Sequence, residues 1–292
     1  MLTFLDHLLG GVASGAVIAL MALALVLVWR SSRVVNFAQV GQAMFTTFVG
    51  LVVIRITGNW LVALIAAIAA GVVLGLIVHF LVMRPVRRQD GSGAIIATFG
   101  VLIALQAIAS MIWGVDPQAY PPLVDVIGYE VFGRTWPIAP YDLLIIGVMV
   151  LLVLILTIVF TRTSLGLRMR ASAFNPTVAR LSGVRVARML ALGWALSGAI
   201  GAIAGVLIAP RFTVTPYSLD ILLILAFTAA VIGGLDSLVG AVSFGIGTGL
   251  VLSLVAGYSD PGNASIVALV LLALNLLLKP QGVFGHHHSR SV

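Results

Sequence analysis

Residues 161–189, TRTSLGLRMRASAFNPTVARLSGVRVARM, form a polar stretch between two long apolar runs. The stretch has no acidic residue, and its arginines are Arg162, Arg168, Arg170, Arg180, Arg185 and Arg188. The flanking runs are long enough to cross a bilayer, so a polar stretch between them must leave the membrane. Because cytoplasmic loops carry the excess of lysine and arginine, we expect a cytoplasmic loop at 162–188.

This basic loop contains a predicted short helix over 175–184. Asn175 is a favourable N-cap, Pro176 suits the first helical position, and Gly183 can end the helix. The loop is also longer than a simple connection between two helices. Two interpretations follow: the helix is a docking element for a cytoplasmic partner, or the loop only fixes the orientation of the chain.

The composition is that of a membrane protein. The chain has 292 residues, of which 61% are hydrophobic and 9% charged, and its mean hydropathy is +1.19. Soluble domains contain about 25% charged residues. We therefore expect an all-α, polytopic helical bundle with a single transmembrane domain over 1–292. The chain has no cysteine, which excludes disulfides and thiol chemistry.

Nine apolar segments are candidates for membrane spans, since a bilayer core requires about 20 apolar residues per helix. They are 8–29, 35–54, 60–83, 94–113, 140–161, 189–209, 219–234, 237–257 and 263–278. The seventh is short and ends at Gly233 and Gly234, which is typical of a broken or re-entrant segment. The sequence thus predicts eight or nine transmembrane segments.

The basic residues predict an orientation with the N-terminus outside and the C-terminus in the cytoplasm. In that orientation only Arg55, Arg134 and Arg211 lie on the outer side. The longest outer loop is then 114–139, an extracytoplasmic loop whose four prolines prevent a long helix. It is either a hydrophobic re-entrant hairpin or a contact surface for an external substrate-delivery protein.

Small residues recur at helical spacing. Gly-x-x-x-Gly patterns at 71–75, 201–205 and 245–249 predict close helix packing. The strings SGAVIA at 14–19 and SGAIGA at 197–202 are similar, and the two helices that contain them run in opposite directions in the predicted topology. This fits the inverted-repeat character of many transporters.

No group of residues predicts catalysis. The chain has no phosphate-binding Gly-x-x-x-x-Gly-Lys motif and no His-x-x-x-His or His-Glu pair for a metal, and the three adjacent histidines at 286–288 fit a solvated tail better than a metal site. We therefore expect no catalytic residue, no metal and no cofactor. No carboxylate lies in the middle of a predicted span, which argues against ion-coupled transport. The chain is therefore not expected to be an enzyme.

Three amides begin the second apolar segment: Asn36, Gln39 and Gln42. They either form a polar helix entry at the membrane surface or line a pathway or interface. Polar groups that face lipid are costly. We therefore expect these side chains to face the interior of the bundle or an interface with a second, similar chain.

Several strings resemble permease subunits of branched-chain amino acid ABC importers. In ABC importers a coupling loop with the core E-A-A-x-x-x-G sits in a cleft of the ATPase. Here Thr177, Val178 and Ala179 stand in place of E-A-A, and Gly183 matches the glycine, although the glutamate is missing. VNFA at 35–38 is similar to the N-F-A-H-G segment of that family, and GGLDS at 233–237 and KPQGVFG at 279–285 are further matches.

The resemblance implies a multi-pass permease subunit in the inner or plasma membrane. It implies import of branched-chain or hydrophobic amino acids, or of related small amides such as urea, by alternating access. The partners would be two ABC ATPases, a second similar permease chain and an extracytoplasmic substrate-binding protein. Thr177, Val178, Ala179, Arg180 and Gly183 would form the ATPase-coupling site. The alternative is a stand-alone secondary transporter or channel.

Overall fold

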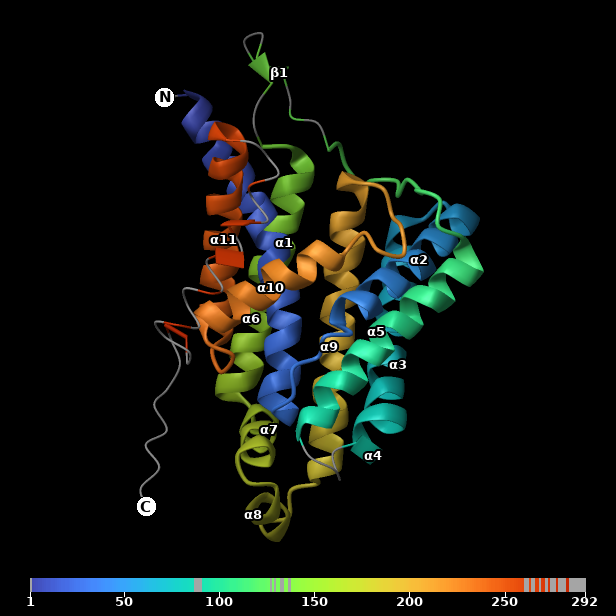
Figure 1. Cartoon of the computed structure of the whole chain (residues 1–292), viewed down its shortest axis with the longest axis vertical. Helices are drawn as coiled ribbons and strands as arrows, with labels where there is room; N and C mark the ends of the chain where they lie inside the picture. The colour runs from blue at the N-terminus through green and yellow to red at the C-terminus, as the bar shows by residue number, and fades with distance from the viewer. Residues whose placement is uncertain are drawn as a thin grey trace.

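The computed structural model is an all-helical bundle with one small hairpin (Figure 1). It describes residues 2–86 and 91–259, except 127, 129, 132, 133, 136 and 137, and also 263, 266, 267, 269, 270, 273, 277, 282 and 283. Among these residues, seven helices are long and apolar enough to cross a membrane. The seventh predicted segment is the shorter helix α10 (Asp220–Gly233), and the predicted segment 263–278 lies largely outside the described residues.

Helix α1 (Leu2–Ser32) passes through the centre of the bundle (Figure 1). Its apolar span is 89% buried, whereas the span of α6 (Pro140–Arg162) is 22% buried and lies on the periphery. The helices packed against α1 include α9 (Val186–Ile208), α10 and α11 (Leu238–Tyr258). An almost entirely apolar helix is stable in this position because neighbouring helices cover most of its surface.

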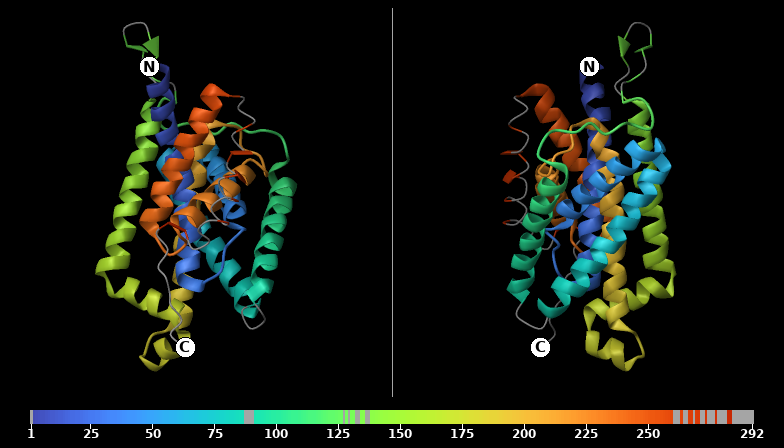
Figure 2. Two further views of the ribbon diagram at one scale, coloured as in Figure 1. Left: turned by 60° about the vertical axis from the view of Figure 1, so that its left-hand side comes forward. Right: turned by 90° about the vertical axis from the view of Figure 1, so that its right-hand side faces the viewer.

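A second group of helices packs on the other side of α9. Helix α2 (Gln39–Thr57) contacts α9, α3 (Trp60–Ile77) and α5 (Gly91–Trp113). Figure 2 shows α5 and α6 on opposite sides of the bundle. The observed helix ends agree with the predicted apolar segments to within a few residues, apart from α1, which begins earlier.

Glycines bring helices into close contact, as their spacing predicts. A side chain at Gly15 would overlap the backbone of α11, and one at Gly71 would overlap the backbone of Gly198 on α9. Gly245 and Gly249 likewise pack against α1. The small residues therefore allow close backbone approach, which replaces the missing hydrophobic driving force between helices in lipid.

Several short elements were not predicted from the sequence. Helix α3 continues as a π-helical turn, η1 (Val78–Met83), and α4 (Arg84–Val86). The basic loop contains α7 (Ser164–Phe174) before the predicted short helix, which is α8 (Pro176–Leu181). A 3-10 turn, η2 (Ala209–Arg211), follows α9, and β1 (Glu130–Val131) pairs with β2 (Arg134–Thr135) in the loop over 114–139.

Candidate functional site

Asn36, Gln39, Gln42 and Ser197 form one buried polar group, here called the Gln39 cluster. Each side chain is at most 1% exposed. Asn36 Nδ2 donates to Gln39 Oε1 at 3.0 Å, and Gln39 Nε2 donates to the Ser197 carbonyl oxygen at 3.0 Å. Ser197 Oγ lies 2.7 Å from both Gln39 Oε1 and the Ala24 carbonyl oxygen. The cluster therefore joins α1, α2 and α9 through side-chain hydrogen bonds.

The local sequence explains how the cluster forms. Helix α2 begins at Gln39, so Asn36 lies in the non-helical segment 33–38 rather than on the helix. Asn36 Oδ1 accepts a hydrogen bond from the Ala38 amide at 3.1 Å, which fixes the turn before the helix. Gly201 faces the Gln39 amide, and any side chain at Gly201 would overlap it. Gln42 Nε2 is buried without a hydrogen-bond partner.

The same non-helical segment is held by contacts with more distant elements. The Phe37 ring stacks on Phe99 of α5, with 4.5 Å between ring centroids, and lies 5.5 Å from Phe227 of α10. Arg33 Nη1 donates to Asp236 Oδ1 at 2.5 Å, in the turn between α10 and α11. This ion pair is partly exposed and contributes little to stability. The pair nevertheless connects the segment before α2 to the turn between α10 and α11.

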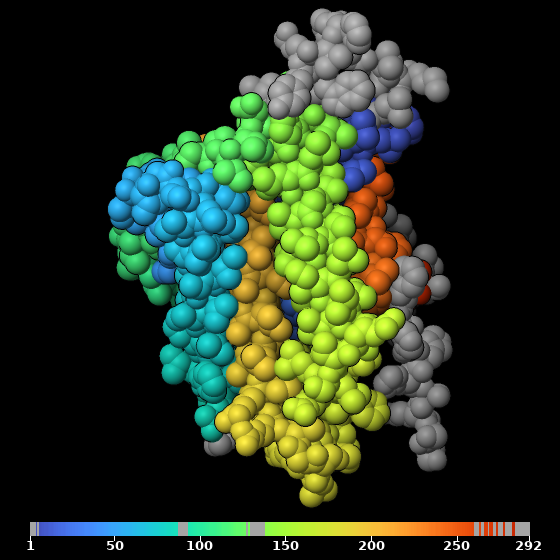
Figure 3. Space-filling view, turned by 180° about the vertical axis from the view of Figure 1, so that it is seen from behind, coloured from blue at the N-terminus to red at the C-terminus, as the bar shows by residue number. Residues whose placement is uncertain are grey.

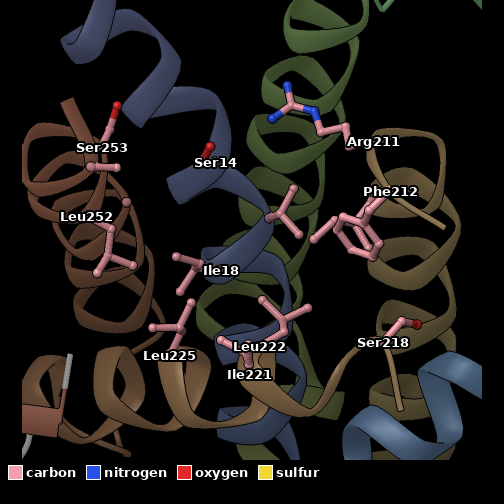
Figure 4. Close-up of a pocket in the computed structure, with 14 residues that line it drawn as sticks. Ser14, Ile18, Arg211, Phe212, Ser218, Ile221, Leu222, Leu225, Leu252 and Ser253 are labelled. Atoms are coloured by element: carbon pink, nitrogen blue, oxygen red, sulfur yellow. The ribbon is translucent and has the colours of Figure 1, made fainter. Parts of the chain in front are cut away.

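A second feature is a pocket of about 610 Å³ between α1, α10, α11 and the end of α9, here called the Ser14 pocket (Figure 4). Its walls are mostly aliphatic, with a few polar groups. One of these is Arg211, which forms an ion pair with Asp142 of α6. Asp142 Oδ2 also accepts from the Ala139 amide at 2.9 Å, so the carboxylate is fixed in place.

The described part of the 114–139 loop is attached to the bundle beside this pocket. Gln118 and Val214 exchange backbone hydrogen bonds of 3.1 and 2.8 Å. Tyr120 is 3% exposed, and burial raises the pKa of its hydroxyl to about 12. The tyrosine therefore stays neutral and acts as a packing residue. The Gln118 pairing holds the non-helical segment 212–219, which leads into α10.

The basic loop folds into α7 and α8, which project from one end of the bundle (Figure 3). Asn175 Oδ1 accepts from the Thr177 and Val178 amides at 3.1 and 3.0 Å, as the predicted N-cap requires. Gly183 has a φ of 80°, which is the left-handed conformation that ends a helix.

The predicted coupling residues do not all face the same way. Thr177, Val178, Arg180 and Gly183 are exposed, whereas Ala179 is 3% exposed and packs with Val186 and Leu190 of α9. The side chain of Ala179 therefore anchors α8 to the bundle.

Other exposed residues of this loop are large and apolar. Leu181 is 85% exposed and Phe174 is 72% exposed. No sequence pattern marked these two residues, or Arg211 and Asp142, as functional. Only Ser197 carried a signal, because it begins the string that resembles 14–19.

Comparisons with known proteins identify the family. A family model described as "Branched-chain amino acid transport system / permease component" matches residues 7–276. The chain is 30% identical to the high-affinity branched-chain amino acid transport system permease protein LivH of Escherichia coli strain K12, over 97% of this chain and 96% of the relative. It is 28% identical, with the same coverage, to the corresponding permease protein BraD of Pseudomonas aeruginosa. No solved structure matches it.

The chain therefore belongs to the family of branched-chain amino acid transport permeases. It is a multi-pass membrane protein and the permease component of an ABC transport system, not an enzyme. Such a component works with an ATPase and a substrate-binding protein.

Proposed function

We propose that this permease moves branched-chain amino acids inward by alternating access, and that the α7–α8 loop couples it to the ATPase. The observation that carries the proposal is the exposed apolar surface of α8 and its neighbours in a loop without acidic residues. Val178 is 56% exposed, Leu181 85% and Phe174 72%. Large apolar side chains in a polar loop favour a protein–protein contact. Arg180 and Arg185 supply positive charge for acidic groups on the ATPase.

The loop is attached rigidly enough to pass on a movement of the ATPase. Ala179 packs into α9, and the Val184 amide donates to the Ala179 carbonyl oxygen at 2.9 Å. Helix α9 also carries Ser197, which belongs to the Gln39 cluster. A displacement of α8 therefore acts directly on the hydrogen bonds between α9 and α2. This gives the ATPase a structural route to the centre of the permease.

The proposal includes an inverted repeat in which α1, α2 and α3 correspond to α9, α10 and α11. Helix α1 packs closely on α11 through Gly15 and Gly249, and α9 packs closely on α3 through Gly198 and Gly71. In both halves the middle helix follows a non-helical segment, at 33–38 and 212–219. The similar strings at 14–19 and 197–202 lie at corresponding positions of the first helices.

With the N-terminus outside, the outer half of the proposed pathway is open and the cytoplasmic half is closed. Ser14 is exposed in the Ser14 pocket, on the outer side, whereas its counterpart Ser197 is 1% exposed in the Gln39 cluster. On the cytoplasmic side of that cluster, the Phe37 stack and the Arg33–Asp236 ion pair close the path. This arrangement corresponds to an outward-facing state.

We further assign two ATPases, a second permease chain and an external binding protein as partners in the cell membrane. Two copies of a coupling loop would engage two ATPases, and the exposed apolar faces of the bundle leave room for a second permease chain. The described part of the outer loop, fixed through Gln118, offers a rigid surface for the binding protein.

Reconstitution tests the proposal. The chain is co-expressed with an ATPase and a binding protein of the same transport system and placed in proteoliposomes, and uptake of radiolabelled leucine is measured with and without ATP. We expect uptake that requires ATP and the binding protein, with competition by isoleucine and valine. ATP-independent uptake by the permease alone would instead identify a stand-alone transporter.

The orientation is tested by cysteine labelling, for which the cysteine-free chain is already suitable. Ala119→Cys and Ser182→Cys both replace exposed residues. A membrane-impermeant thiol reagent should reach the first from outside the cell and the second only from the cytoplasmic side. Labelling of both from one side would contradict the topology and the assignment of the coupling loop.

A further inference from the structure

Helix α1 has one exposed side chain in its central part. From residue 6 to residue 32 of α1, Ser14 is the only exposed residue. It lies in the wall of the Ser14 pocket, and it forms no hydrogen bond with any described residue (Figure 4). A free hydroxyl in the wall of a pocket, on a helix whose central part is otherwise buried or half-buried, is available to a ligand.

The opposite side of the pocket supplies a positive group that is already held in position. One guanidinium nitrogen of Arg211 contacts the Asp142 carboxylate. A guanidinium has five N–H donors, so most of the Arg211 donors remain available. Because Asp142 balances its charge, the pocket carries no net charge. An uncharged or zwitterionic ligand therefore suits it better than an ion.

Between these polar groups the walls are aliphatic. Figure 4 shows Ile18, Leu222 and Leu225 in the lower part of the pocket, with Leu252 of α11 on the side away from Arg211. A volume of about 610 Å³ falls in the usual range for small-molecule sites, and such sites combine apolar walls with a few placed polar groups. A lipid chain would fill the apolar part but would make no use of Arg211 or Ser14.

We infer that the Ser14 pocket is the site where the permease receives its amino acid from the outer side. The ligand class is a zwitterionic α-amino acid with an aliphatic side chain. Its carboxylate accepts hydrogen bonds from Arg211, its ammonium donates to the Ser14 hydroxyl oxygen, and its side chain packs on Ile18, Leu222 and Leu252. The inference rests on the proposed importer function and extends it to a specific binding site.

The first test is ligand protection of a cysteine in the assembled transporter. Ser14→Cys is treated from outside with a small hydrophilic thiol reagent, with and without saturating L-leucine delivered by the binding protein. We expect leucine to slow labelling at least threefold. Ser259→Cys is the matched control, since it is an exposed serine on the same side, next to α11, and is not a pocket residue. Its labelling rate should not depend on leucine.

Leucine analogues then test the two charged contacts. In the same assay, free L-leucine is compared with 4-methylpentanoate, which lacks the ammonium, and with 3-methylbutylamine, which lacks the carboxylate. Only the amino acid should protect Ser14→Cys at the same concentration. Equal protection by all three compounds would show that the pocket accepts any aliphatic molecule, which would overturn the assignment.

Two substitutions give a second measurement. Ser14→Leu fills the opening of the pocket, and we expect uptake to fall at least tenfold while the ATPase still co-purifies. Arg211→Lys keeps a positive charge for Asp142 but loses the planar fork that binds carboxylates, so KM for uptake should rise about tenfold. Wild-type uptake by both variants would contradict the inference.

These outcomes distinguish the pocket assignment from the importer function on which it rests. If the wild-type complex imports leucine with ATP but leucine does not protect Ser14→Cys, the pocket assignment is wrong and the importer function stands. If the wild-type complex shows no ATP-dependent uptake of any branched-chain amino acid, the importer function fails and the pocket assignment fails with it.

Discussion

Gly183 offers a direct test of the coupling loop. It ends α8 with a φ of 80°, next to the exposed Leu181, and a side chain at this position would meet no atom within 4 Å. Gly183→Trp therefore changes two things only: the backbone must hold a left-handed conformation, and a bulky ring projects from the proposed ATPase contact.

The substitution lowers the folding stability of the permease only slightly, and a control variant can carry the same strain. A side chain in the left-handed region costs about 1–2 kcal/mol, compared with about 5–15 kcal/mol for the stability of a typical domain. Gly58 has a φ of 65°, ends α2 at the opposite end of the bundle, and also has no atom within 4 Å of an added Cβ. Gly58→Trp thus carries similar strain and bulk away from the loop.

The expected difference is functional. Loss of a central interface contact costs about 2 kcal/mol or more, which corresponds to roughly a thirtyfold change in association. Gly183→Trp should therefore release the ATPase on purification, or uncouple ATP hydrolysis from leucine uptake. Gly58→Trp should behave as wild type, and Gly183→Ala, which keeps the strain but not the bulk, should lie between them.

If Gly183→Trp retains both ATPase association and uptake at the level of Gly58→Trp, the α7–α8 loop is not the ATPase contact. The arginines of the loop would then serve only to orient the chain in the membrane. The family assignment would be unaffected, because it rests on the match over residues 7–276.

Two further predictions concern buried polar groups and are measured by thermal unfolding in detergent. Gly201→Ala should lower the free energy of unfolding by about 1–3 kcal/mol, because the new methyl group displaces the Gln39 amide from its buried hydrogen bonds. Gly247→Ala is the control: it lies in open space on α11 and should raise the free energy of unfolding by up to about 1 kcal/mol. Equal effects of the two substitutions would contradict the cluster geometry. Asp142→Asn should destabilise by about 3–5 kcal/mol because Arg211 is left without its partner, whereas the double variant with Arg211→Gln should be clearly less destabilised.

The spans were predictable because their signal is local. An apolar run of about 20 residues in a chain of this composition forms a helix wherever it lies, since lipid leaves the backbone no other partner. The N-cap at Asn175 and the left-handed Gly183 were predictable for the same reason, because each depends on neighbouring residues only. Helix α7 was missed because its sequence has no long apolar run, although Thr163 provides an N-cap whose hydroxyl oxygen accepts from the Gly166 amide at 3.4 Å.

The candidate sites depend on contacts that no local pattern records. Arg211 was expected only as a charge on the outer side, yet tertiary packing joins it to Asp142 in an ion pair. Ala179 was expected on the ATPase-facing side because of its alignment with a family motif, but the structure turns it toward α9. Which face of a six-residue helix is buried depends on the helix beside it.

The proposed inverted repeat explains why one serine is exposed and its counterpart is buried. If the two halves exchange their conformations, Ser197 must lose its bond to Gln39 and Ser14 must become covered. Breaking the Gln39 cluster exposes polar groups that are costly to leave unpaired in a bundle interior, which keeps the inner side closed at rest. Helix α9 carries Ser197 near its middle and packs against Ala179 of α8 near its start. In the proposed mechanism the ATPase would act through α8 on the helix whose movement breaks the cluster, so opening inward would require work supplied at α8.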